Sequence, residues 1–309
     1  MNKITIIGAG RVGESTAMAL AKEDIVNEIT LIDVREGPAE GAALDIQETA
    51  PLLGFDTHLS GSTDPAAMAG SDVVIITAGI PRKPGMSRLD VLDTNVRIID
   101  GIVDEVVKHA PGAIMLVVSN PVDILTYRAW KRSGWPRSHV FGQAGVLDSS
   151  RMAAFVAMET GFSTRDISAL MLGSHGDAMV PLMRYTTISG IPVDQFIDRD
   201  AREKIIERSR HAGAEILALK QNSSAYEAPA AAIATMVCAV ARDRKRILPT
   251  VAILEGEYGY EELAMGVPCM LGEDGMERII ELELNAEEKA MFDQSIETIQ
   301  EGIQQLDQM

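Results

Sequence analysis

The sequence predicts an α/β protein in which a doubly wound parallel sheet is followed by a mixed α+β domain. Three observations lead to this prediction. Short apolar runs alternate with helical patterns up to about residue 145, a glycine-rich turn follows the first run, and the helical patterns lengthen beyond residue 145. We therefore expect two domains, at residues 1–145 and 146–309.

In the first domain, strands are expected at residues 4–7, 28–32, 73–76 and 114–118. The last two are continuous apolar runs, as in strands that a parallel sheet buries on both faces. The helical patterns that alternate with them lie at about residues 11–22, 39–49 and 93–109, and Pro111-Gly112 ends the third.

In the second domain, longer helices are expected with strand-like segments between them. The helical patterns cover about residues 148–160, 200–220 and 228–241, and one of the strand-like segments covers 167–172. A last helix begins near Asn285, a good N-cap with Glu288 three residues on. Apolar residues then recur at spacings of four and three, which predicts one buried stripe: Phe292, Ile296, Ile299, Ile303 and Leu306.

The composition of the 309-residue chain is that of a globular protein, with 46% hydrophobic and 24% charged residues. Its net charge of −17 argues against nucleic acid or an anionic membrane as a partner. No apolar stretch reaches the roughly 18–20 residues that cross a bilayer, and no signal peptide precedes the first strand. Cys238 and Cys269 lack the spacing of a disulfide framework or a metal site. We expect a cytoplasmic protein without a metal.

A glycine motif follows the first strand. Gly8-Ala9-Gly10-Arg11-Val12-Gly13 fits the pattern G-x-G-x-x-G, whose glycines let the backbone approach a pyrophosphate at a helix N-terminus. Asp33 ends the second strand 20 residues after Gly13, where a carboxylate binds the ribose 2′-hydroxyl. The pattern predicts a Rossmann-type site for NAD, because Asp33 would repel the 2′-phosphate of NADP, although Arg35 favours that phosphate. The alternative is a glycine-rich turn beside an unrelated surface aspartate.

Small and polar residues end two further strands, Thr77-Ala78-Gly79 and Val118-Ser119-Asn120. Ligands of doubly wound folds bind outside the carboxyl ends of the strands, so both tips are expected beside the cofactor. Asn120 has the chemistry to donate to a substrate hydroxyl or to the cofactor amide. It also fits an N-cap before Pro121 at the first helical position, and the two roles are compatible.

A candidate catalytic histidine lies in Gly173-Ser174-His175-Gly176-Asp177. Hydride transfer from a secondary alcohol needs a base for the hydroxyl proton, and an imidazole with a pKa of about 6.5 serves in both directions. Asp148 and Arg151 lie three residues apart on one helical face, where the aspartate could orient the imidazole and the arginine grip a carboxylate. The alternatives are a structural histidine and an ordinary surface ion pair.

Two arginines six residues apart stand in the run Pro81-Arg82-Lys83-Pro84-Gly85-Met86-Ser87-Arg88. A guanidinium pairs bidentately with a carboxylate, so the second arginine suggests a substrate with an extra carboxylate. The alternative is a solvated basic turn. A dianionic substrate is repelled by the overall charge, but salt screens that charge over about 8–10 Å, so a local cluster of arginines can reverse the sign.

Together and in this order, these motifs resemble those of the lactate/malate dehydrogenase family over essentially the whole chain. The resemblance implies NAD-dependent interconversion of malate and oxaloacetate, with His175 as the acid/base and Asp148 as its partner. It also implies that Arg151 binds the carboxylate next to the reacting carbon and that Arg88, on a loop that closes over the substrate, polarises the carbonyl. Arg82 would take the distal carboxylate, where lactate dehydrogenases typically have glutamine.

Substrate contacts are thus expected from Arg82, Arg88, Asn120 and Arg151. The residues expected at the cofactor are Gly8, Ala9, Gly10, Arg11, Val12, Gly13, Asp33, Thr77, Ala78, Gly79, Asn95, Val118, Ser119 and Asn120. The resemblance also implies a homotetramer or homodimer. One departure concerns Ser224 and Ala225, whose roles in the pocket stay open because many relatives have glycine at the position of Ser223.

Three other functions compete with this interpretation. A lactate dehydrogenase is disfavoured by Arg82. A short-chain dehydrogenase uses Tyr-x-x-x-Lys, which Tyr127 and Lys131 match, but its glycine motif is longer and no serine is suitably spaced. A non-enzymatic NAD sensor on the same fold would bind the cofactor without turnover.

Overall fold

The computed structural model describes residues 1–80, 88–306 and 308, with the backbone alone at residues 88–90. A nine-stranded sheet with the order β14-β13-β12-β6-β5-β4-β1-β2-β3 forms its centre. The six strands from the first half pair in parallel. They are β1 (Lys3–Ile7), β2 (Glu28–Ile32), β3 (His58–Ser62), β4 (Val73–Ile76), β5 (Ile114–Val117) and β6 (Val140–Gly142). The predicted doubly wound parallel sheet is confirmed.

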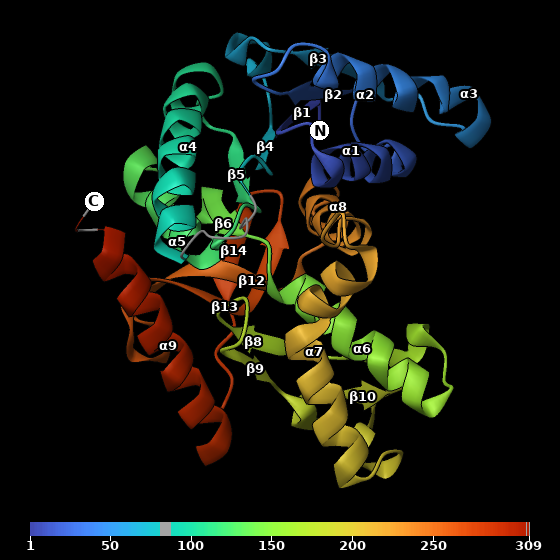
Figure 1. The fold of residues 1–309 in the computed structure, drawn as a ribbon, viewed down its shortest axis with the longest axis vertical. Helices are drawn as coiled ribbons and strands as arrows, with labels where there is room; N and C mark the ends of the chain where they lie inside the picture. The colour runs from blue at the N-terminus through green and yellow to red at the C-terminus, as the bar shows by residue number, and fades with distance from the viewer. Residues whose placement is uncertain (81–87, 307, 309) are drawn as a thin grey trace.

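Helices cover both faces of this sheet. Figure 1 shows α4 and α5 on one side of the central strands and α1 on the other. All residues of β4 and β5 are buried, as their unbroken apolar runs predict. The helices of the first half are α1 (Arg11–Glu23), α2 (Pro38–Glu48), α3 (Ala50–Leu53), α4 (Arg88–His109) and α5 (Val122–Ser133).

The second half adds helices, three strands to the large sheet and two small sheets. Its helices are α6 (Gly145–Thr160), α7 (Arg199–Lys220), α8 (Glu227–Ala241) and α9 (Ala286–Leu306). Its strands are β7 (Ile167–Ser168), β8 (Met171–Gly173), β9 (Met179–Pro181), β10 (Thr187–Ile188), β11 (Ile191–Pro192), β12 (Arg246–Glu255), β13 (Glu261–Gly272) and β14 (Gly275–Ile279). Short 3-10 helices occur at Pro65–Met68, Arg137–His139, Thr164–Asp166, Met183–Tyr185, Val193–Gln195 and Glu257–Gly259.

The large sheet runs through both halves of the chain. Strand β12 joins β6 in antiparallel pairing, with Val251 opposite Gly142. β13 and β14 then continue the sheet as antiparallel strands. The two expected domains therefore share one sheet across residue 145, and one apolar cluster contains Ile4 from the first half and Phe292 from the second.

Two expected elements differ from the structure, and β3 was not expected. The segment 167–172 is wrong as a single strand, because β7 and β8 belong to different sheets. Helix α4 begins at Arg88 and not near residue 93. The sequence does not predict β3, because its residues His-Leu-Ser-Gly-Ser are mostly polar and lie at the sheet edge. Gly61 in β3 is needed for packing, since a Cβ there would lie 2.2 Å from the backbone nitrogen of Glu40 in α2.

The last helix begins as predicted. The side-chain oxygen of Asn285 accepts a hydrogen bond from Glu288 N at 2.9 Å, and the Glu288 carboxylate accepts one from Asn285 N at 2.9 Å. This reciprocal pair is the expected capping box. The apolar stripe of α9 is confirmed as well, with Phe292, Ile296, Ile299 and Leu306 buried and Ile303 partly buried against the core.

Within the described residues, no helix is both long enough and apolar enough to span a membrane.

Candidate functional site

The glycine motif forms the turn between β1 and α1, and its three glycines meet different constraints. Gly8 has a φ of +106°, and a Cβ there would lie 2.7 Å from Ala78 N. A Cβ on Gly13 would lie 1.9 Å from the carbonyl oxygen of Gly8. Gly10 faces open space, and no side chain caps α1 at this residue. The turn therefore fits a dinucleotide, because its backbone is accessible at a helix N-terminus.

Asp33 follows β2 and reaches this turn. Its Oδ2 accepts a hydrogen bond from Ala9 N at 3.0 Å, and its Oδ1 accepts from Arg35 N at 3.0 Å and Arg35 Nε at 3.2 Å. Burial raises the pKa of the Asp33 carboxyl group, but the hydrogen bonds from Arg35 and Ala9 outweigh burial and lower it. Asp33 is thus ionised at neutral pH, and Arg35 is paired with it.

Arg11, the first residue of α1, stacks on a residue from the second half. Its guanidinium carbon lies 5.3 Å from the centroid of the Tyr226 ring, and Lys220 Nζ lies 3.7 Å from the same centroid. Tyr226 follows Ser224 and Ala225, so this stretch lies near the glycine turn.

The two polar strand tips are held together by their own side chains. Thr77 Oγ1 donates to the carbonyl oxygens of Ile7 and Gly8 at 3.1 and 3.0 Å. Ser119 Oγ donates to Ala78 O at 2.5 Å. These bonds bring Ala78, Gly79 and Val118 to the same edge of the sheet as the glycine turn, where the sequence places the cofactor.

Asn95 lies behind these tips on α4 and is only 2% exposed. Its Oδ1 accepts from Ile80 N at 2.8 Å, and its Nδ2 donates to Asn120 O at 2.8 Å. A Cβ on Gly79 would lie 3.3 Å from Asn95 Oδ1. The side chain of Asn95 thus connects the two loops, an arrangement that the sequence does not reveal.

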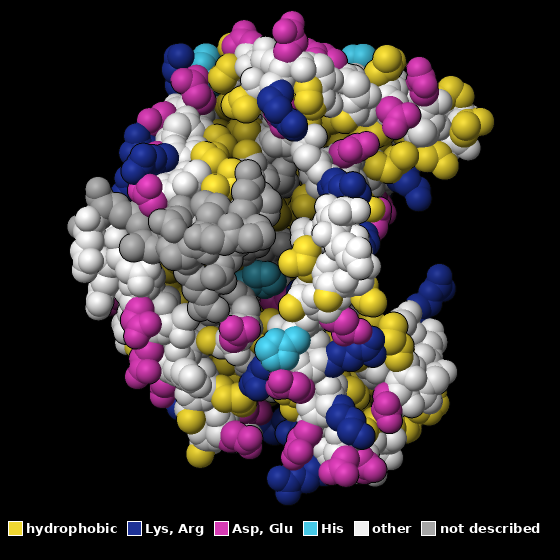
Figure 2. Space-filling model, viewed as in Figure 1, with side chains coloured by type: hydrophobic (Ala, Val, Ile, Leu, Met, Phe, Trp, Pro, Cys, Tyr) yellow, Lys and Arg dark blue, Asp and Glu magenta, His cyan; other side chains and the backbone are white. Residues whose placement is uncertain are grey.

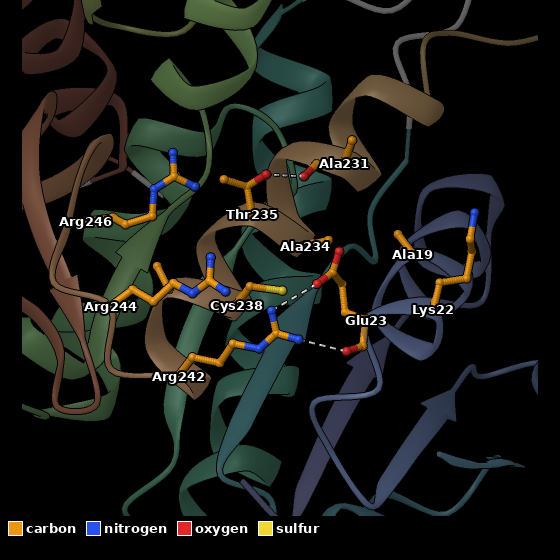
Figure 3. Close-up of a pocket in the computed structure, with 11 residues that line it drawn as sticks. Ala19, Lys22, Glu23, Ala231, Ala234, Thr235, Cys238, Arg242, Arg244 and Arg246 are labelled. Carbon is orange, nitrogen blue, oxygen red and sulfur yellow. Dashed lines mark hydrogen bonds and ion pairs between the residues drawn. The ribbon is translucent and has the colours of Figure 1, made fainter. Parts of the chain in front are cut away.

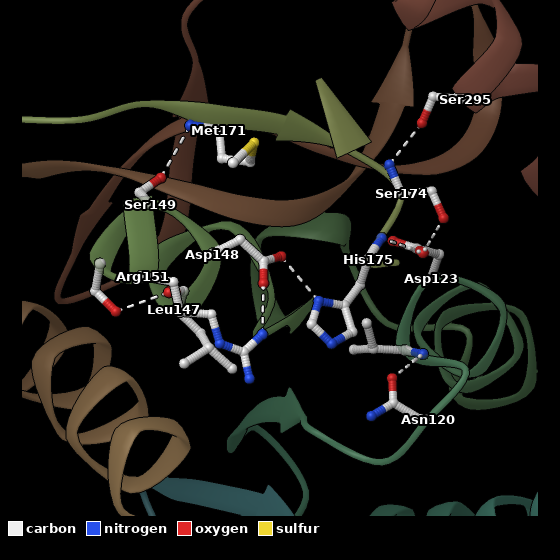
Figure 4. Close-up of polar contacts among 12 residues, drawn as sticks. Asn120, Asp123, Leu147, Asp148, Ser149, Arg151, Met171, Ser174, His175 and Ser295 are labelled. Atoms are coloured by element: carbon white, nitrogen blue, oxygen red, sulfur yellow. Dashed lines mark hydrogen bonds and ion pairs between the residues drawn. The ribbon is translucent and has the colours of Figure 1, made fainter. Parts of the chain in front are cut away.

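Asn120 precedes α5 and a cis peptide bond to Pro121. Its Oδ1 accepts a hydrogen bond from Val122 N at 3.4 Å. The prediction that Asn120 is the N-cap is wrong, because Pro121 is the N-cap residue, Val122 is the first helical residue and no side chain caps α5. In Figure 4, Asn120 lies below His175.

His175 and Asp148 form a hydrogen-bonded pair between the β8–β9 loop and α6 (Figure 4). His175 Nδ1 lies 2.8 Å from Asp148 Oδ2. The side chain of Asp148 is 2% exposed and that of His175 is 21% exposed. The negative charge of Asp148 raises the pKa of His175, and this effect exceeds the opposing effect of burial. Because Nδ1 faces Asp148, Nε2 is the nitrogen available to a substrate.

Arg151 lies one turn further along α6, and its Nη1 is 3.1 Å from Asp148 Oδ1. Its side chain is 12% exposed, and its buried Nε has no hydrogen-bond partner among the described residues. The ion pair between Asp148 and Arg151 that the sequence suggests as an alternative is therefore present. It does not lie at the surface, because both side chains are largely buried. A buried guanidinium nitrogen without a partner is suited to a carboxylate ligand.

Arg82 lies outside the described residues, and so does the side chain of Arg88. The positions of these two side chains relative to Arg151 therefore lie outside the described part of the structure. Helix α4 begins at Arg88.

Two family models match the chain. One, described as the lactate/malate dehydrogenase NAD binding domain, matches residues 2–142. The other, described as the lactate/malate dehydrogenase alpha/beta C-terminal domain, matches residues 145–309. The chain belongs to the lactate/malate dehydrogenase family. The predicted family membership is confirmed, and the NAD-binding fold lies where the glycine motif predicts it.

Among members of this family, a malate dehydrogenase from Thioalkalivibrio sulfidiphilus is 67% identical over 99% of this chain and 100% of its own length. A structure of malate dehydrogenase from Salinibacter ruber has a TM-score of 0.95 at 44% identity and covers 99% of this chain and 98% of its own. A lactate dehydrogenase from Cryptosporidium parvum in complex with lactic acid and NAD has a TM-score of 0.96 at 36% identity, covering 100% and 98%. Because both enzymes fit equally well, the backbone alone does not distinguish their substrates.

Sequence reasoning missed Asp123 in the first turn of α5, which is 4% exposed. Its Oδ2 accepts hydrogen bonds from Ser174 Oγ at 2.8 Å and from His175 N at 3.0 Å. An acidic residue in a first helical turn usually compensates the helix dipole at the surface, so the sequence carries no signal of this contact.

In the Tyr-x-x-x-Lys match, Lys131 makes structural contacts, unlike the catalytic lysine of short-chain dehydrogenases. Lys131 Nζ is 2.6 Å from Glu262 Oε2 on β13 and 4.7 Å from the centroid of the Trp130 ring. This lysine joins α5 to β13 through an ion pair, as expected if the match to the short-chain dehydrogenase motif arises by chance.

A cavity of about 400 Å³ lies elsewhere, between α1 and α8 (Figure 3). Arg242 crosses it to Glu23, donating to the carbonyl oxygen of that residue at 2.9 Å. Cys238, Arg244 and Arg246 also line it, and none of the site residues described above does. Among the described residues, no three His, Cys, Asp or Glu side chains gather as they would around a metal ion.

Proposed function

We propose that this chain is an NAD-dependent malate dehydrogenase that interconverts L-malate and oxaloacetate. The observation that carries the proposal is the hydrogen-bonded pair of His175 and the buried Asp148, with Nδ1 and Oδ2 2.8 Å apart and Arg151 bound to the same carboxylate. Asn120, which follows β5 of the NAD-binding half, is drawn below this pair in Figure 4.

In malate oxidation, neutral His175 accepts the hydroxyl proton of the substrate at Nε2. Asp148 keeps the other ring proton on Nδ1 and stabilises the imidazolium that forms. NAD, when bound, supplies the nicotinamide ring that accepts the hydride. In the reverse direction, protonated His175 returns the proton, so its raised pKa favours reduction of oxaloacetate near neutral pH.

The substrate contacts belong to the same proposal. Arg151 binds the carboxylate next to the reacting carbon, using the Nε that has no hydrogen-bond partner among the described residues. Arg88 polarises the carbonyl, Arg82 binds the distal carboxylate, and Asn120 touches the hydroxyl.

The turn geometry supports the proposed cofactor contacts. The backbone of residues 8–13, with Arg11, would hold the pyrophosphate, and Asp33 would accept a hydrogen bond from the ribose hydroxyl. The strand tips at residues 77–79 and 118–120 would hold the nicotinamide half. Asn95 acts by connecting these tips, since its amide is bonded to backbone atoms of both loops.

We also propose a homodimer or homotetramer that works in the cytoplasm, in the malate oxidation step of the tricarboxylic acid cycle. Large apolar side chains on α2, α3 and α6 support an assembly, because they are exposed in the single chain: Leu44, Leu52, Leu53 and Met158. Figure 2 shows hydrophobic side chains at the surface of the α3 end of the molecule.

Steady-state NADH oxidation with oxaloacetate and with pyruvate, at matched concentrations, tests the activity. We expect a preference for oxaloacetate of at least about 10³-fold, since a site that pairs a polar group rejects an analogue lacking it by about 10⁴–10⁵-fold. Comparable rates would indicate a broader 2-keto acid reductase, and NADH binding without turnover would indicate a sensor.

The variant Arg82→Gln assigns the selectivity to one residue. It should lose most activity on oxaloacetate and gain some on pyruvate, because the distal carboxylate loses its bidentate partner. His175→Asn serves as the control that keeps NADH binding while turnover is abolished. Unchanged selectivity of Arg82→Gln would remove this arginine from the substrate site.

A further inference from the structure

Asp123 places a buried carboxylate against the loop that carries Ser174 and His175 (Figure 4). It comes from the start of α5 in the first half of the chain, whereas Ser174 and His175 follow β8 in the second half. Its Oδ2 receives two hydrogen bonds, from the Ser174 hydroxyl at 2.8 Å and from the backbone nitrogen of His175 at 3.0 Å.

The backbone before His175 is fixed from other sides by neutral groups. Ser174 N donates to Ser295 Oγ on α9 at 2.6 Å. Gly173 has a φ of +89°, and a Cβ on Gly266 of β13 would lie 2.3 Å from the Gly173 carbonyl oxygen. Since neutral contacts already fix the strand end, hydrogen bonding alone does not explain why a carboxylate is buried at position 123.

Burying this carboxylate costs free energy. Its Oδ1 is buried and has no hydrogen-bond partner among the described residues. Burial raises the pKa of Asp123, and the bonds from Ser174 and the charge of His175 only partly oppose this. An asparagine would accept the same two hydrogen bonds without a buried charge. The charge therefore needs a reason of its own.

We propose that Asp123 is a positioning residue for the proposed reaction, which holds the His175 peptide in place and sets a second negative charge behind the imidazole. The proposal rests on the proposed role of His175 as the acid/base. The described charged groups around the ring are Asp148 and Arg151 from α6 and Asp123 from α5. With His175 protonated, two negative and two positive charges balance in this cluster.

The variant Asp123→Asn separates the charge from the hydrogen bonds. Loss of one nearby negative charge should lower the pKa of His175 by about half to one unit. Oxaloacetate reduction needs protonated His175, so the alkaline fall of kcat/KM should move to lower pH by the same amount. The variant should also be at least as thermostable as the native protein at neutral pH, because it no longer buries a charge.

Ser174→Ala is the matched control, because it removes one hydrogen bond to Asp123 and keeps the charge. Its alkaline fall should stay within about 0.2 units of the native value, a shift that corresponds to a change of under twofold in the ionisation constant. If Asp123→Asn leaves the alkaline fall where it is, the charge of Asp123 does not act on the imidazole and the proposal is wrong. If Asp123→Asn does not fold, Asp123→Ser, with a hydroxyl acceptor and no charge, takes its place.

The ring of His175 is also titrated directly by NMR in the NADH complex, with its resonance assigned by its loss in His175→Asn. A lowered pKa in Asp123→Asn supports the proposal even if the native protein has no dehydrogenase activity. Absence of turnover in the native protein contradicts the proposed function, whereas an unshifted His175 resonance contradicts the role of Asp123, so the two failures are distinguishable.

Discussion

At the scale of single residues, the chemistry of the site depends on the charges that surround His175. The carboxylate of Asp148 is the main reason that the pKa of His175 is raised, and Arg151 opposes it from the other side of that carboxylate. The aspartate also fixes which ring nitrogen carries the proton, since it contacts only Nδ1. Asp148 therefore determines both the orientation of the imidazole and the direction in which its pKa is shifted.

The variant Asp148→Asn removes the negative charge beside His175 and tests its effect on the imidazole. The pKa of His175 should fall, because its strongest stabilising charge is removed. Oxaloacetate reduction, which needs the protonated ring, should then decline at a lower pH than in the native protein. Turnover at neutral pH should drop by about 10²-fold or more, as expected for loss of positioned acid–base catalysis. Initial rates from pH 5 to 10 measure both effects.

The exposed residue Asp45 on α2 provides the control for this variant. Asp45→Asn removes the same charge far from the ring and should leave the pH profile unchanged. Equal profiles for Asp148→Asn and the native protein would contradict the role assigned to Asp148.

Sequence motifs identify His175 and Asp148 but not the residue that supports them. His175 stands between glycines, and Asp148 lies one helical turn before Arg151, so local spacing is enough to single them out. Asp123 lies 52 residues before His175 and meets it only because the start of α5 lies against the loop that follows β8. Contacts of this kind depend on tertiary packing, which no local pattern encodes.

At the scale of elements, the β1–α1 turn combines two different demands on glycine. Gly13 is required by the protein itself, because a Cβ would lie 1.9 Å from the backbone oxygen of Gly8. Gly10 is not required by the protein, since nothing lies within 4 Å of its Cβ position. If the backbone at Gly10 lies against the cofactor, its glycine is required by the ligand.

The two alanine variants should therefore behave differently. Gly13→Ala should lower the free energy of unfolding by about 1–3 kcal/mol, because backbone atoms must move to admit the methyl group. Gly10→Ala should unfold as the native protein does and yet bind NADH more weakly. Denaturant unfolding and quenching of NADH fluorescence measure the two quantities. Native affinity in Gly10→Ala would show that the cofactor does not approach this residue.

Elements with a strong local sequence pattern are predicted correctly. Elements whose formation depends on pairing with strands distant in the sequence are not. Helix α9 is predicted from its capping box and stripe, and β4 from its apolar run. By contrast, the segment 167–172 divides between two sheets, and no strand was expected in the region of β12 and β13. Their pairing partners are distant in the sequence, so their place in the sheet is a property of the whole fold.

At the scale of the whole molecule, the two halves are joined by more than the active site. Strand β12 extends the sheet at β6, and α1 packs along α8. The main apolar cluster draws residues from both halves, including Val140 and Leu248. Separating the halves would expose the edge of β6 and a large apolar surface, both of which are unfavourable in water.

We therefore expect the chain to unfold in one cooperative transition. Trp130 and Trp135, the two tryptophans of the chain, both lie in the first half, so their fluorescence reports that half, whereas far-UV circular dichroism reports all helices. The two midpoints should coincide, and NADH should raise both together, because a ligand bound to the native state stabilises every part that unfolds with its site. A tryptophan transition separate from the loss of helix would show that residues 1–145 unfold as an independent domain despite the shared sheet.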